Sequence, residues 1–353
     1  MREPMLRQVD NYEALWKQVD YSTLPIPERF NLGVACIDEQ DPNARAITVV
    51  GPDRSSHGYT FGELVDQANR LANVLREQGV RQGDVVALVN PASLETGVAF
   101  MALFRMGAIA LPLASLFGPD ALKFRLRHGE ARAVITSGAN LTKVREALRE
   151  GERLPVLVIG GEPGAGEMSY AQAVAEASAH FEPVFTRADD PAFLIYTSGT
   201  TGEPKGALHA HRVIFGHVPA FETLYDFYPK PADVLWSPAD WAWLAGLMDI
   251  LVPAWFQGLP LVVDLDGSFS AERAVWLMRE FRVTLTLLPA TALRIIRAAG
   301  LAGGGFAFRT VCSGGEALGA DLLAWSEEFF GAPVNEGYGQ TELNASIGNC
   351  ASV

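Results

Sequence analysis

The chain has 353 residues, of which 49% are apolar and 20% charged, and its 28 basic and 41 acidic side chains give a formal net charge of −13. This length exceeds one ordinary hydrophobic core and predicts two or three subdomains. The acidic balance argues against a protein that binds duplex nucleic acid or an anionic membrane surface. The N-terminus lacks the apolar region of a signal peptide, and no stretch approaches the roughly 18 apolar residues of a membrane span.

The cysteines and histidines give no sign of a disulfide framework or a zinc site. Cys36, Cys312 and Cys350 are scattered and form no CxxC pair. We therefore expect a reducing, cytoplasmic compartment. His209 and His211 have no Cys or acidic partner at zinc-ligand spacing, so we interpret them as polar residues at the start of a helix.

Short β-branched runs alternate with segments of helical periodicity. The segment 60–79 repeats apolar residues every three or four positions. Thr60 and Glu63 have the spacing of a capping box at its start, and Gly79 that of a glycine just past its end. Further helices are expected within 141–150, 271–281 and 318–329, and strands at 47–50, 84–89, 134–136, 156–159, 193–196, 234–236, 261–263, 285–288 and 310–312. This alternation predicts an α/β fold with parallel sheets covered by helices.

A glycine-rich segment at 160–169 carries two acidic residues and predicts an exposed loop near a subdomain boundary. We accordingly divide the chain into a first α/β subdomain with an N-terminal extension, residues 1–165, and a second α/β subdomain, residues 166–353. No internal repeat or low-complexity tract interrupts either part.

The run 192–212, AFLIYTSGTTGEPKGALHAHR, changes abruptly from an apolar strand to a turn rich in glycine and hydroxyl groups. Glycines allow close approach of the backbone to a ligand, successive amides can form an anion nest, and Lys205 adds a positive point charge. With a strand before the loop and a helix after it, the loop is suited to phosphate. A mobile surface loop would have the same composition. The spacing excludes a Walker A loop, because Gly202 is followed by Glu203 and no Ser or Thr follows Lys205.

Residues 196–206, YTSGTTGEPKG, resemble the signature of the adenylate-forming superfamily, which includes acyl-CoA synthetases, firefly luciferase and the adenylation domains of peptide synthetases. Other stretches resemble further motifs of that family in the expected order: WSPADWAW at 236–243, SGGEAL at 313–318 and EGYGQTE at 336–342. The resemblance covers essentially the whole chain. It implies two parallel-rich β-sheets covered by helices in stacked subdomains, as in the large N-terminal domain of these enzymes.

The resemblance implies a reaction in which a small-molecule carboxylic acid and ATP give an acyl-adenylate and pyrophosphate, and the acyl group then passes to the thiol of coenzyme A. The implied cofactors are ATP, Mg²⁺ and coenzyme A. By motif position, the nucleotide-binding residues are Thr197, Ser198, Gly199, Thr200, Thr201, Gly202 and Lys205 in the loop, Gly315, Glu316 and Ala317 beside the adenine, and Glu336, Gly337, Tyr338, Gly339, Gln340 and Thr341 in the last motif.

The same motifs imply roles for single residues. Lys205, Thr341 and Glu342 are the candidate catalytic residues. Lys205 belongs to the loop that holds the β- and γ-phosphates, and Thr341 would donate to the α-phosphate. Glu342 would bind Mg²⁺, a hard cation that prefers oxygen ligands, and the alternative is a solvated surface acid. Tyr338 would stack on the adenine, and the alternative is a plain core aromatic.

At the acyl end, Trp243, Gly314 and Gly339 are the candidate substrate-binding residues. Trp243 matches a family tryptophan near the acyl or pantetheine tunnel, and for both Trp241 and Trp243 an ordinary packing role is an open alternative. Acetyl-specific members carry a tryptophan where Gly339 stands. We therefore expect open space beside Gly339 and an acid larger than acetate: medium-chain, branched or aromatic. Ala242 stands where the family has glycine.

Because the family continues well beyond its last motif here, we expect a part of a longer ligase that lacks the small C-terminal domain and has little turnover alone. Two alternatives stay open. One is a non-catalytic nucleotide-binding module, and the other is the adenylation domain of another adenylate-forming enzyme, for which Asp240 is the nearest acid for an amino group. The sequence does not name the acid or the oligomeric state.

Overall fold

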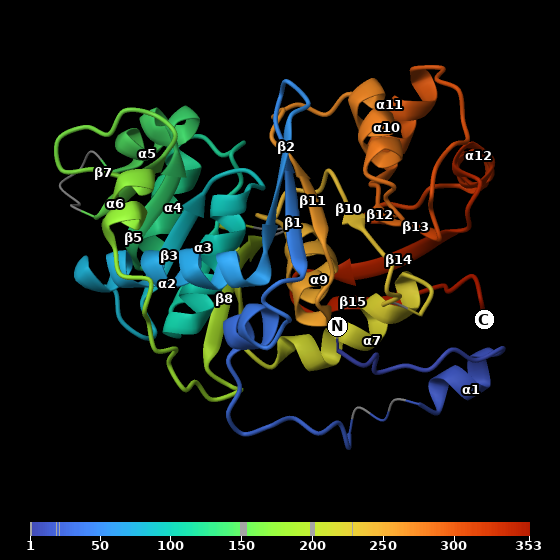
Figure 1. The fold of residues 1–353 in the computed structure, drawn as a ribbon, viewed down its shortest axis with the longest axis horizontal. Helices are drawn as coiled ribbons and strands as arrows, with labels where there is room; N and C mark the ends of the chain where they lie inside the picture. Colours follow the sequence, from blue (N-terminus) through green and yellow to red (C-terminus); the bar gives the residue numbers. More distant parts are fainter. Residues whose placement is uncertain (1, 19, 21, 149–153, 198–201, 228) are drawn as a thin grey trace.

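Two β-sheets form the framework of the protein, and helices lie between them and on their outer faces (Figure 1). The computed structural model describes residues 2–18, 20, 22–148, 154–197, 202–227 and 229–353. The eight-stranded sheet has the order β15-β14-β13-β12-β10-β11-β1-β2, and the seven-stranded sheet the order β7-β6-β5-β3-β4-β8-β9.

The strands of the two sheets have these bounds. The eight-stranded sheet contains β1 (Arg45–Val50), β2 (Ser56–Thr60), β10 (Leu235–Trp236), β11 (Leu261–Asp264), β12 (Leu285–Leu287), β13 (Thr310–Gly314), β14 (Val334–Gln340) and β15 (Asn344–Gly348). The seven-stranded sheet contains β3 (Val85–Val89), β4 (Ile109–Pro112), β5 (Ala131–Ser137), β6 (Val156–Ile159), β7 (Met168–Ser169), β8 (Pro191–Thr197) and β9 (Lys205–Ala210).

Most neighbouring strands are parallel, which confirms the predicted fold class. Three edge pairs are antiparallel: β1 with β2, β8 with β9, and β14 with β15. The predicted subdomain boundary at residue 165 stays a prediction. The two sheets do not divide at that residue. The early strands β1 and β2 belong to the eight-stranded sheet, whereas β7, β8 and β9, which follow residue 165, belong to the seven-stranded sheet.

The helices and helical turns have these bounds: α1 (Tyr12–Trp16), η1 (Val34–Asp38), α2 (Phe61–Glu77), α3 (Leu94–Met106), α4 (Pro119–His128), η2 (Gly138–Asn140), α5 (Leu141–Ala147), α6 (Tyr170–Glu176), α7 (Val213–Leu224), α8 (Leu244–Gly246), η3 (Leu247–Leu251), α9 (Val252–Gln257), α10 (Ala271–Glu280), α11 (Ala290–Ala298) and α12 (Ala320–Phe330). Within the described part of the chain, none of the helices combines the length and the apolar character that crossing a bilayer requires.

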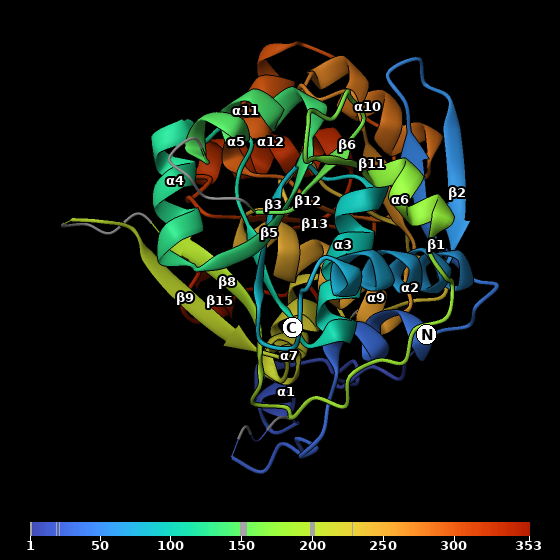
Figure 2. The same ribbon diagram turned by 90° about the vertical axis from the view of Figure 1, so that its left-hand side faces the viewer.

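The alternation of side chains along each strand explains the layers. In β3, Val86 and Leu88 face the central core, whereas Ala87 and Val89 face the core under α4 and α5. The central core also holds α2, α3, α9 and strands of the other sheet, and α10, α11 and α12 cover the far face of the eight-stranded sheet. The result is a stack of helices, sheet, helices, sheet and helices (Figures 1 and 2).

The capping box predicted for α2 is present. The Thr60 side chain accepts a hydrogen bond from the Glu63 amide, and the Glu63 carboxylate accepts one from the Thr60 amide at 2.8 Å. Gly79, just past the end of the helix, has the positive φ of 89° that was expected there. The local sequence therefore defines both ends of this helix.

The segment after the glycine-rich loop differs from the prediction. It is not a helix but β9, which pairs antiparallel with β8 and forms a projecting hairpin (Figure 2). His209 and His211 accordingly lie in and just after a strand, not at a helix start, and both are buried. Residues 205–210 satisfy their backbone groups by pairing with β8, and the helix α7 begins only at Val213.

The space beside Gly339 also differs from the prediction. A Cβ atom at this position would lie within 3.0 Å of backbone atoms of Asn344 and Ala345. The reason is that β15 folds back on β14 and its backbone approaches Gly339 closely. Gly339 thus permits a close hairpin and leaves no open space for a larger side chain.

His211 makes the stability dependent on pH. Its Nδ1 accepts a hydrogen bond from the Leu32 amide at 3.1 Å, and burial lowers the pKa of His211 to about 4 from an ordinary value of 6.5. The folded state therefore favours the neutral ring, so this contribution is complete above pH 6.5 and is lost as the pH falls toward 4, by up to about 3 kcal/mol. Chemical denaturation across this range measures the effect.

The matched variants for that measurement are His211→Asn and His180→Asn. Asn keeps an acceptor for the Leu32 amide and does not titrate, so the first variant should show a flatter stability profile between pH 4 and 6.5 than the parent chain. His180 is exposed, and its replacement should leave the profile unchanged. Identical profiles for His211→Asn and the parent chain would contradict this account.

Gly339→Ala tests the close approach of β15. We expect it to lower the free energy of unfolding by about 1–3 kcal/mol, because the new methyl group must displace the backbone of β15. Gly216→Ala, in α7, meets nothing within 4 Å and should be neutral or stabilising by up to about 1 kcal/mol. Equal unfolding midpoints for the two variants would show that the backbone of β15 leaves room for a methyl group beside residue 339.

Candidate active site

Two hairpins, one from each sheet, meet at the candidate site. Thr197, at the end of β8, donates a hydrogen bond from its hydroxyl to the Glu342 carboxylate at 3.3 Å. His209, in β9, places Nε2 2.7 Å from the Thr341 carbonyl oxygen in the turn between β14 and β15. Burial lowers the pKa of His209, so the ring is neutral near pH 7 and Nε2 carries the proton that it donates. The first and last sequence motifs therefore lie together in the fold.

The loop at the start of this site is only partly described. Ser198, Gly199, Thr200 and Thr201 lie outside the described residues. In the adjoining positions, Lys205 pairs with Thr197 across the hairpin, and Gly202 and Lys205 are exposed.

A cluster of side chains on and just before α4 packs against the end of β8, and no motif in the sequence indicates it. The Tyr196 hydroxyl lies 2.6 Å from His128 Nδ1. The buried Arg125 guanidinium lies 4.1 Å from the centre of the Phe117 ring and 5.6 Å from that of Tyr196. These contacts fix the end of β8 from which the loop departs, and no local pattern around residues 117–128 marks them.

The adenine-side motif and the last motif are neighbours in the eight-stranded sheet. Gly314 of β13 pairs with Gly337 of β14. The Glu336 carboxylate accepts a hydrogen bond from the Leu318 amide at 3.0 Å, which ties the loop 314–318 to β14. Gly315 has a φ of 89°, so the loop turns sharply away from the strand.

Contacts from α11 hold the same loop on its other side. Arg294 Nη1 and the Thr291 hydroxyl lie 3.0 and 3.1 Å from the Glu316 carboxylate. The hydrogen bond from Arg294 is the main reason why the pKa of Glu316 is lowered. Glu316 and the neighbouring Ala317 are exposed. No motif in the sequence indicates Thr291 and Arg294, which come from α11, a helix that precedes Glu316.

Tyr338 is not a core aromatic. Its side chain is 53% exposed, and its hydroxyl accepts a hydrogen bond from the Gln340 side chain at 2.9 Å. Tyr338 directly follows Gly337, which pairs with Gly314 at the start of the loop 314–318, and much of the ring surface is free.

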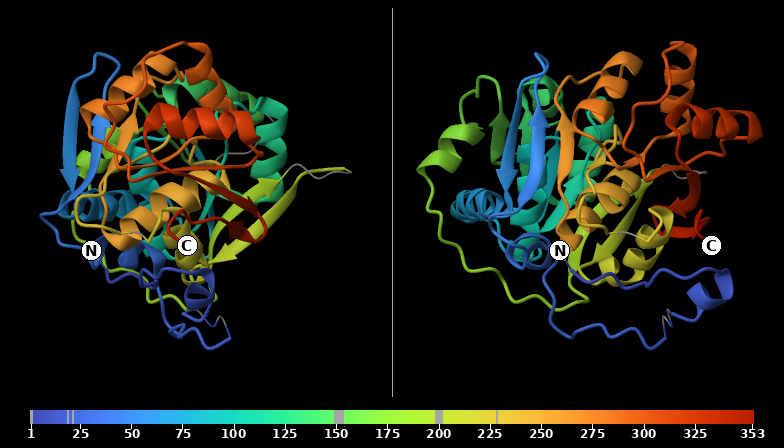
Figure 3. Two further views of the ribbon diagram at one scale, coloured as in Figure 1. Left: turned by 90° about the vertical axis from the view of Figure 1, so that its right-hand side faces the viewer. Right: turned by 45° about the vertical axis from the view of Figure 1, so that its right-hand side comes forward.

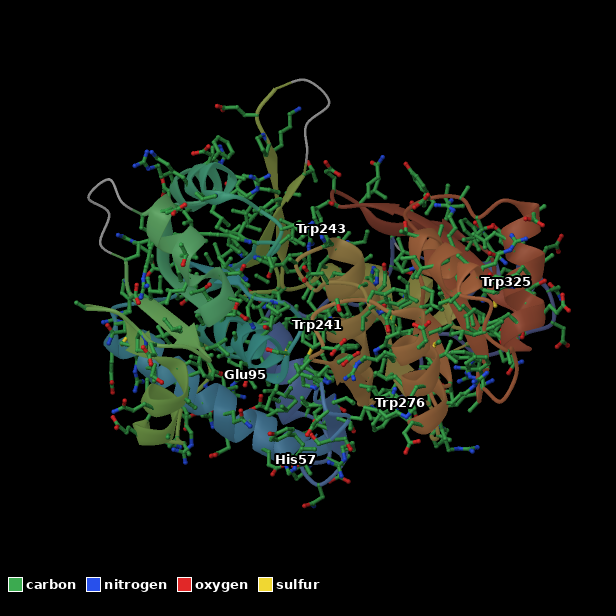
Figure 4. All side chains as sticks on the ribbon, turned by 90° about the horizontal axis from the view of Figure 1, so that it is seen from above. His57, Glu95, Trp241, Trp243, Trp276 and Trp325 are labelled. Atoms are coloured by element: carbon green, nitrogen blue, oxygen red, sulfur yellow. The ribbon has the colours of Figure 1, made fainter. Side chains whose placement is uncertain are left out.

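The two tryptophans behave differently. Trp241 is buried and lies beside Gly97 of α3, next to the buried Trp255 of α9. These surroundings fit an ordinary packing role for Trp241. Trp243 is 44% exposed and meets the Phe117 ring edge to face at 6.0 Å. Figure 4 shows Trp243 near the base of the β8–β9 hairpin, with Trp241 deeper between the two sheets.

The site offers oxygen ligands suited to a hard cation. The exposed Glu342 carboxylate stands beside the Thr197 hydroxyl, and oxygen ligands of this type fit Mg²⁺. Among the described residues, no three His, Cys, Asp or Glu side chains converge on one point. A metal at Glu342 would therefore share its remaining ligands with phosphate or water.

The comparisons agree with this geometry. The family model described as "AMP-binding enzyme" matches residues 37–352. The acetyl-coenzyme A synthetase of Bacillus subtilis is 30% identical over 357 residues, which cover 96% of this chain and 61% of that protein. Among solved structures, Brucella canis acyl-CoA synthetase gives a TM-score of 0.88 at 29% identity, with 98% of this chain and 65% of that chain covered.

A second solved structure is an anthranilate CoA ligase in complex with anthranoyl-AMP. It gives a TM-score of 0.83 at 25% identity, with coverage of 92% of this chain and 63% of that chain. The chain thus spans 61–65% of the length of these three relatives. The matched motifs meet in one place, and the family model spans nearly all of the chain; the chain therefore belongs to the AMP-binding enzyme family of the adenylate-forming superfamily.

Proposed function

We propose that ATP and a carboxylic acid bind where the β8–β9 and β14–β15 hairpins meet. The protein to which this chain belongs would form an acyl-adenylate with release of pyrophosphate, and then a thioester with coenzyme A, as an AMP-forming acid–thiol ligase. The observation that carries this proposal is the 3.3 Å contact between Thr197 and Glu342, which brings the glycine-rich loop and the last motif together.

The proposed chemistry depends on positioning and charge. A carboxylate oxygen attacks the α-phosphorus, so the site must hold two anions together and stabilise the charge on the phosphates. Lys205 and the hydroxyls of the loop would bind the β- and γ-phosphates, and Thr341 would donate to the α-phosphate. When bound at Glu342, Mg²⁺ would neutralise phosphate charge.

The adenine would lie between the Tyr338 ring and the loop 314–318. The exposed ring of Tyr338 and the pairing of the preceding Gly337 with Gly314 support this placement. Base–aromatic stacking of this kind contributes roughly 1–3 kcal/mol. Arg294 and Thr291 would act as positioning residues, because they hold Glu316 and thereby the loop.

For the acid, we propose a medium-chain, branched or aromatic compound, with Trp243 and Gly314 near the acyl group. Because the backbone of β15 approaches Gly339 closely, Gly339 gives no support to this choice. Its support is the structural likeness to an anthranilate CoA ligase and the half-exposed Trp243 beside Phe117. Adenylation of an amino acid through Asp240 is less favoured, because this half-buried side chain accepts a hydrogen bond from the Ala242 amide within its own turn.

Lys205→Ala tests the phosphate role. We expect the affinity for ATP·Mg²⁺ to fall about tenfold or more and that for AMP to change little, because only ATP has the phosphates that Lys205 would contact. Calorimetric titration of each nucleotide measures both affinities. Lys17→Ala, an exposed lysine in the N-terminal segment, is the control and should change neither. Equal losses for ATP and AMP in Lys205→Ala would reject the role.

A second assay separates catalysis from binding alone. When the full-length protein is incubated with ATP, Mg²⁺ and each acid of a panel, the amount of pyrophosphate released should depend on the acid. Tight ATP binding without pyrophosphate release in the full-length protein would instead indicate a nucleotide-binding module.

A further inference from the structure

A buried contact joins a histidine on α7 to an aspartate on η3. His217 on α7 places Nε2 3.0 Å from Asp249 Oδ1 on η3. The His217 side chain has no exposed surface, and that of Asp249 is 17% exposed. Neither residue belongs to the family motifs quoted above, and neither has a part in the proposed chemistry.

The pair lacks the hydrogen bonds that buried polar groups normally have. The 3.0 Å contact is not aligned as a hydrogen bond, so His217 Nδ1, His217 Nε2 and Asp249 Oδ1 have no hydrogen-bond partner among the described residues. Buried polar atoms are nearly always satisfied, and those that are not point to a missing partner. Three such atoms at one place are suited to a polar group supplied by a ligand.

The pair lies near three parts of the chain that carry candidate site residues: β9, the Trp241–Trp243 stretch and β13. His217 lies on α7, which follows β9. Asp249 follows the Trp241–Trp243 stretch and is close enough to Cys312 of β13 to act electrostatically on that thiol. Burial is the main cause of the lowered pKa of His209; the hydrogen bond to Thr341 and the charge of Glu342 oppose it, and His217 adds a small further lowering, so His217 lies within electrostatic reach of His209.

Solvent reaches the pair from the Asp249 side. Ala245, one helical turn before Asp249, is exposed, and Trp243 just before it is 44% exposed. Because Ala245 and Asp249 are four residues apart, their exposed surfaces lie on the same side of this helical segment. Residues 247–251 form a π-helical turn, a rare geometry that is often found at functional sites.

We propose that His217 and Asp249 form the polar end of the acyl-binding space, and that the acid carries a hydroxyl or amino group that binds there. This inference rests on the proposed function and specifies its substrate class. The Asp249 carboxylate only accepts hydrogen bonds, and a neutral imidazole can donate through one nitrogen. A hydroxyl group can donate to Asp249 and accept from His217, and an amino group can donate to Asp249, whereas an alkyl or unsubstituted aryl group would leave all three atoms unsatisfied.

Pairs of acyl-sulfamoyl adenosines, which mimic acyl-adenylates, test this directly. The acyl groups are 2-, 3- and 4-hydroxybenzoyl, each beside its methylbenzoyl counterpart, together with 3-hydroxybutanoyl beside 3-methylbutanoyl. In calorimetric titrations of the 353-residue chain, at least one hydroxyl analogue should bind at least ten times more tightly than its methyl counterpart. The reason is that a methyl group leaves the buried polar atoms of His217 and Asp249 without a hydrogen-bond partner. Equal affinities within every pair would overturn the inference.

Variants assign the preference to the pair. Asp249→Asn and His217→Gln should each reduce the preference for hydroxyl to less than about threefold while AMP binding stays unchanged. The control is Asp240→Asn, a nearby acid bonded to its own turn, which should keep the preference. The assignment would be overturned if Asp240→Asn also lost the preference for the hydroxyl analogues, or if Asp249→Asn kept that preference. If a variant fails to fold, the comparison within analogue pairs in the parent chain still decides.

The two proposals fail in different ways. If neither AMP nor any analogue binds the folded chain, the proposed function is contradicted, and this inference with it. If the analogues bind but do not discriminate hydroxyl from methyl, only the role of His217 and Asp249 is contradicted. The pair would then serve only to lock α7 against residues 247–251.

Discussion

The contact between the β8–β9 and β14–β15 hairpins is the constraint on which the candidate site depends. Each hairpin is the antiparallel edge of a mostly parallel sheet, and each carries one half of the motifs. His209 joins them through the Thr341 carbonyl, and Thr197 joins them through Glu342. Since β8 and β14 run parallel to their inner neighbours, the turn after each lies at the carboxyl edge of its sheet, and the contact between the turns joins residues 145 positions apart.

The packed core behind the hairpins fixes the position of the two sheets relative to each other. Alternate side chains of both sheets enter one central core, and α3 approaches α9 closely at Gly97, where a Cβ would lie 2.6 Å from the Trp255 ring. The Glu222 carboxylate on α7 accepts hydrogen bonds from the Met5 and Leu6 amides and ties the N-terminal segment along α7 (Figure 3). A well-packed interior of this kind transmits small shifts, so substitutions far from the site should still affect it.

Local patterns predicted the elements whose ends are set by local chemistry, such as the capping box at Thr60 and the strands with β-branched runs. The match to family motifs predicted the candidate site, and the contact between Thr197 and Glu342 supports that prediction. The helix expected after the glycine-rich loop was wrong, because the pairing of β9 with β8 depends on a neighbouring strand that composition does not reveal. The same holds for Gly339, whose surroundings are backbone atoms of β15, and for His217 and Asp249, which meet only in the fold.

The most direct test of the account is a calorimetric titration of the 353-residue chain with ATP·Mg²⁺, beside the variant Glu342→Gln. If the hairpins form one nucleotide site, the parent chain should bind one ATP with Mg²⁺, and the variant should lose most of the Mg²⁺-dependent part of that affinity while its unfolding midpoint stays the same. A folded parent chain that binds no ATP, or a variant with the same Mg²⁺ dependence, would contradict the central claim that these two motifs form a single site.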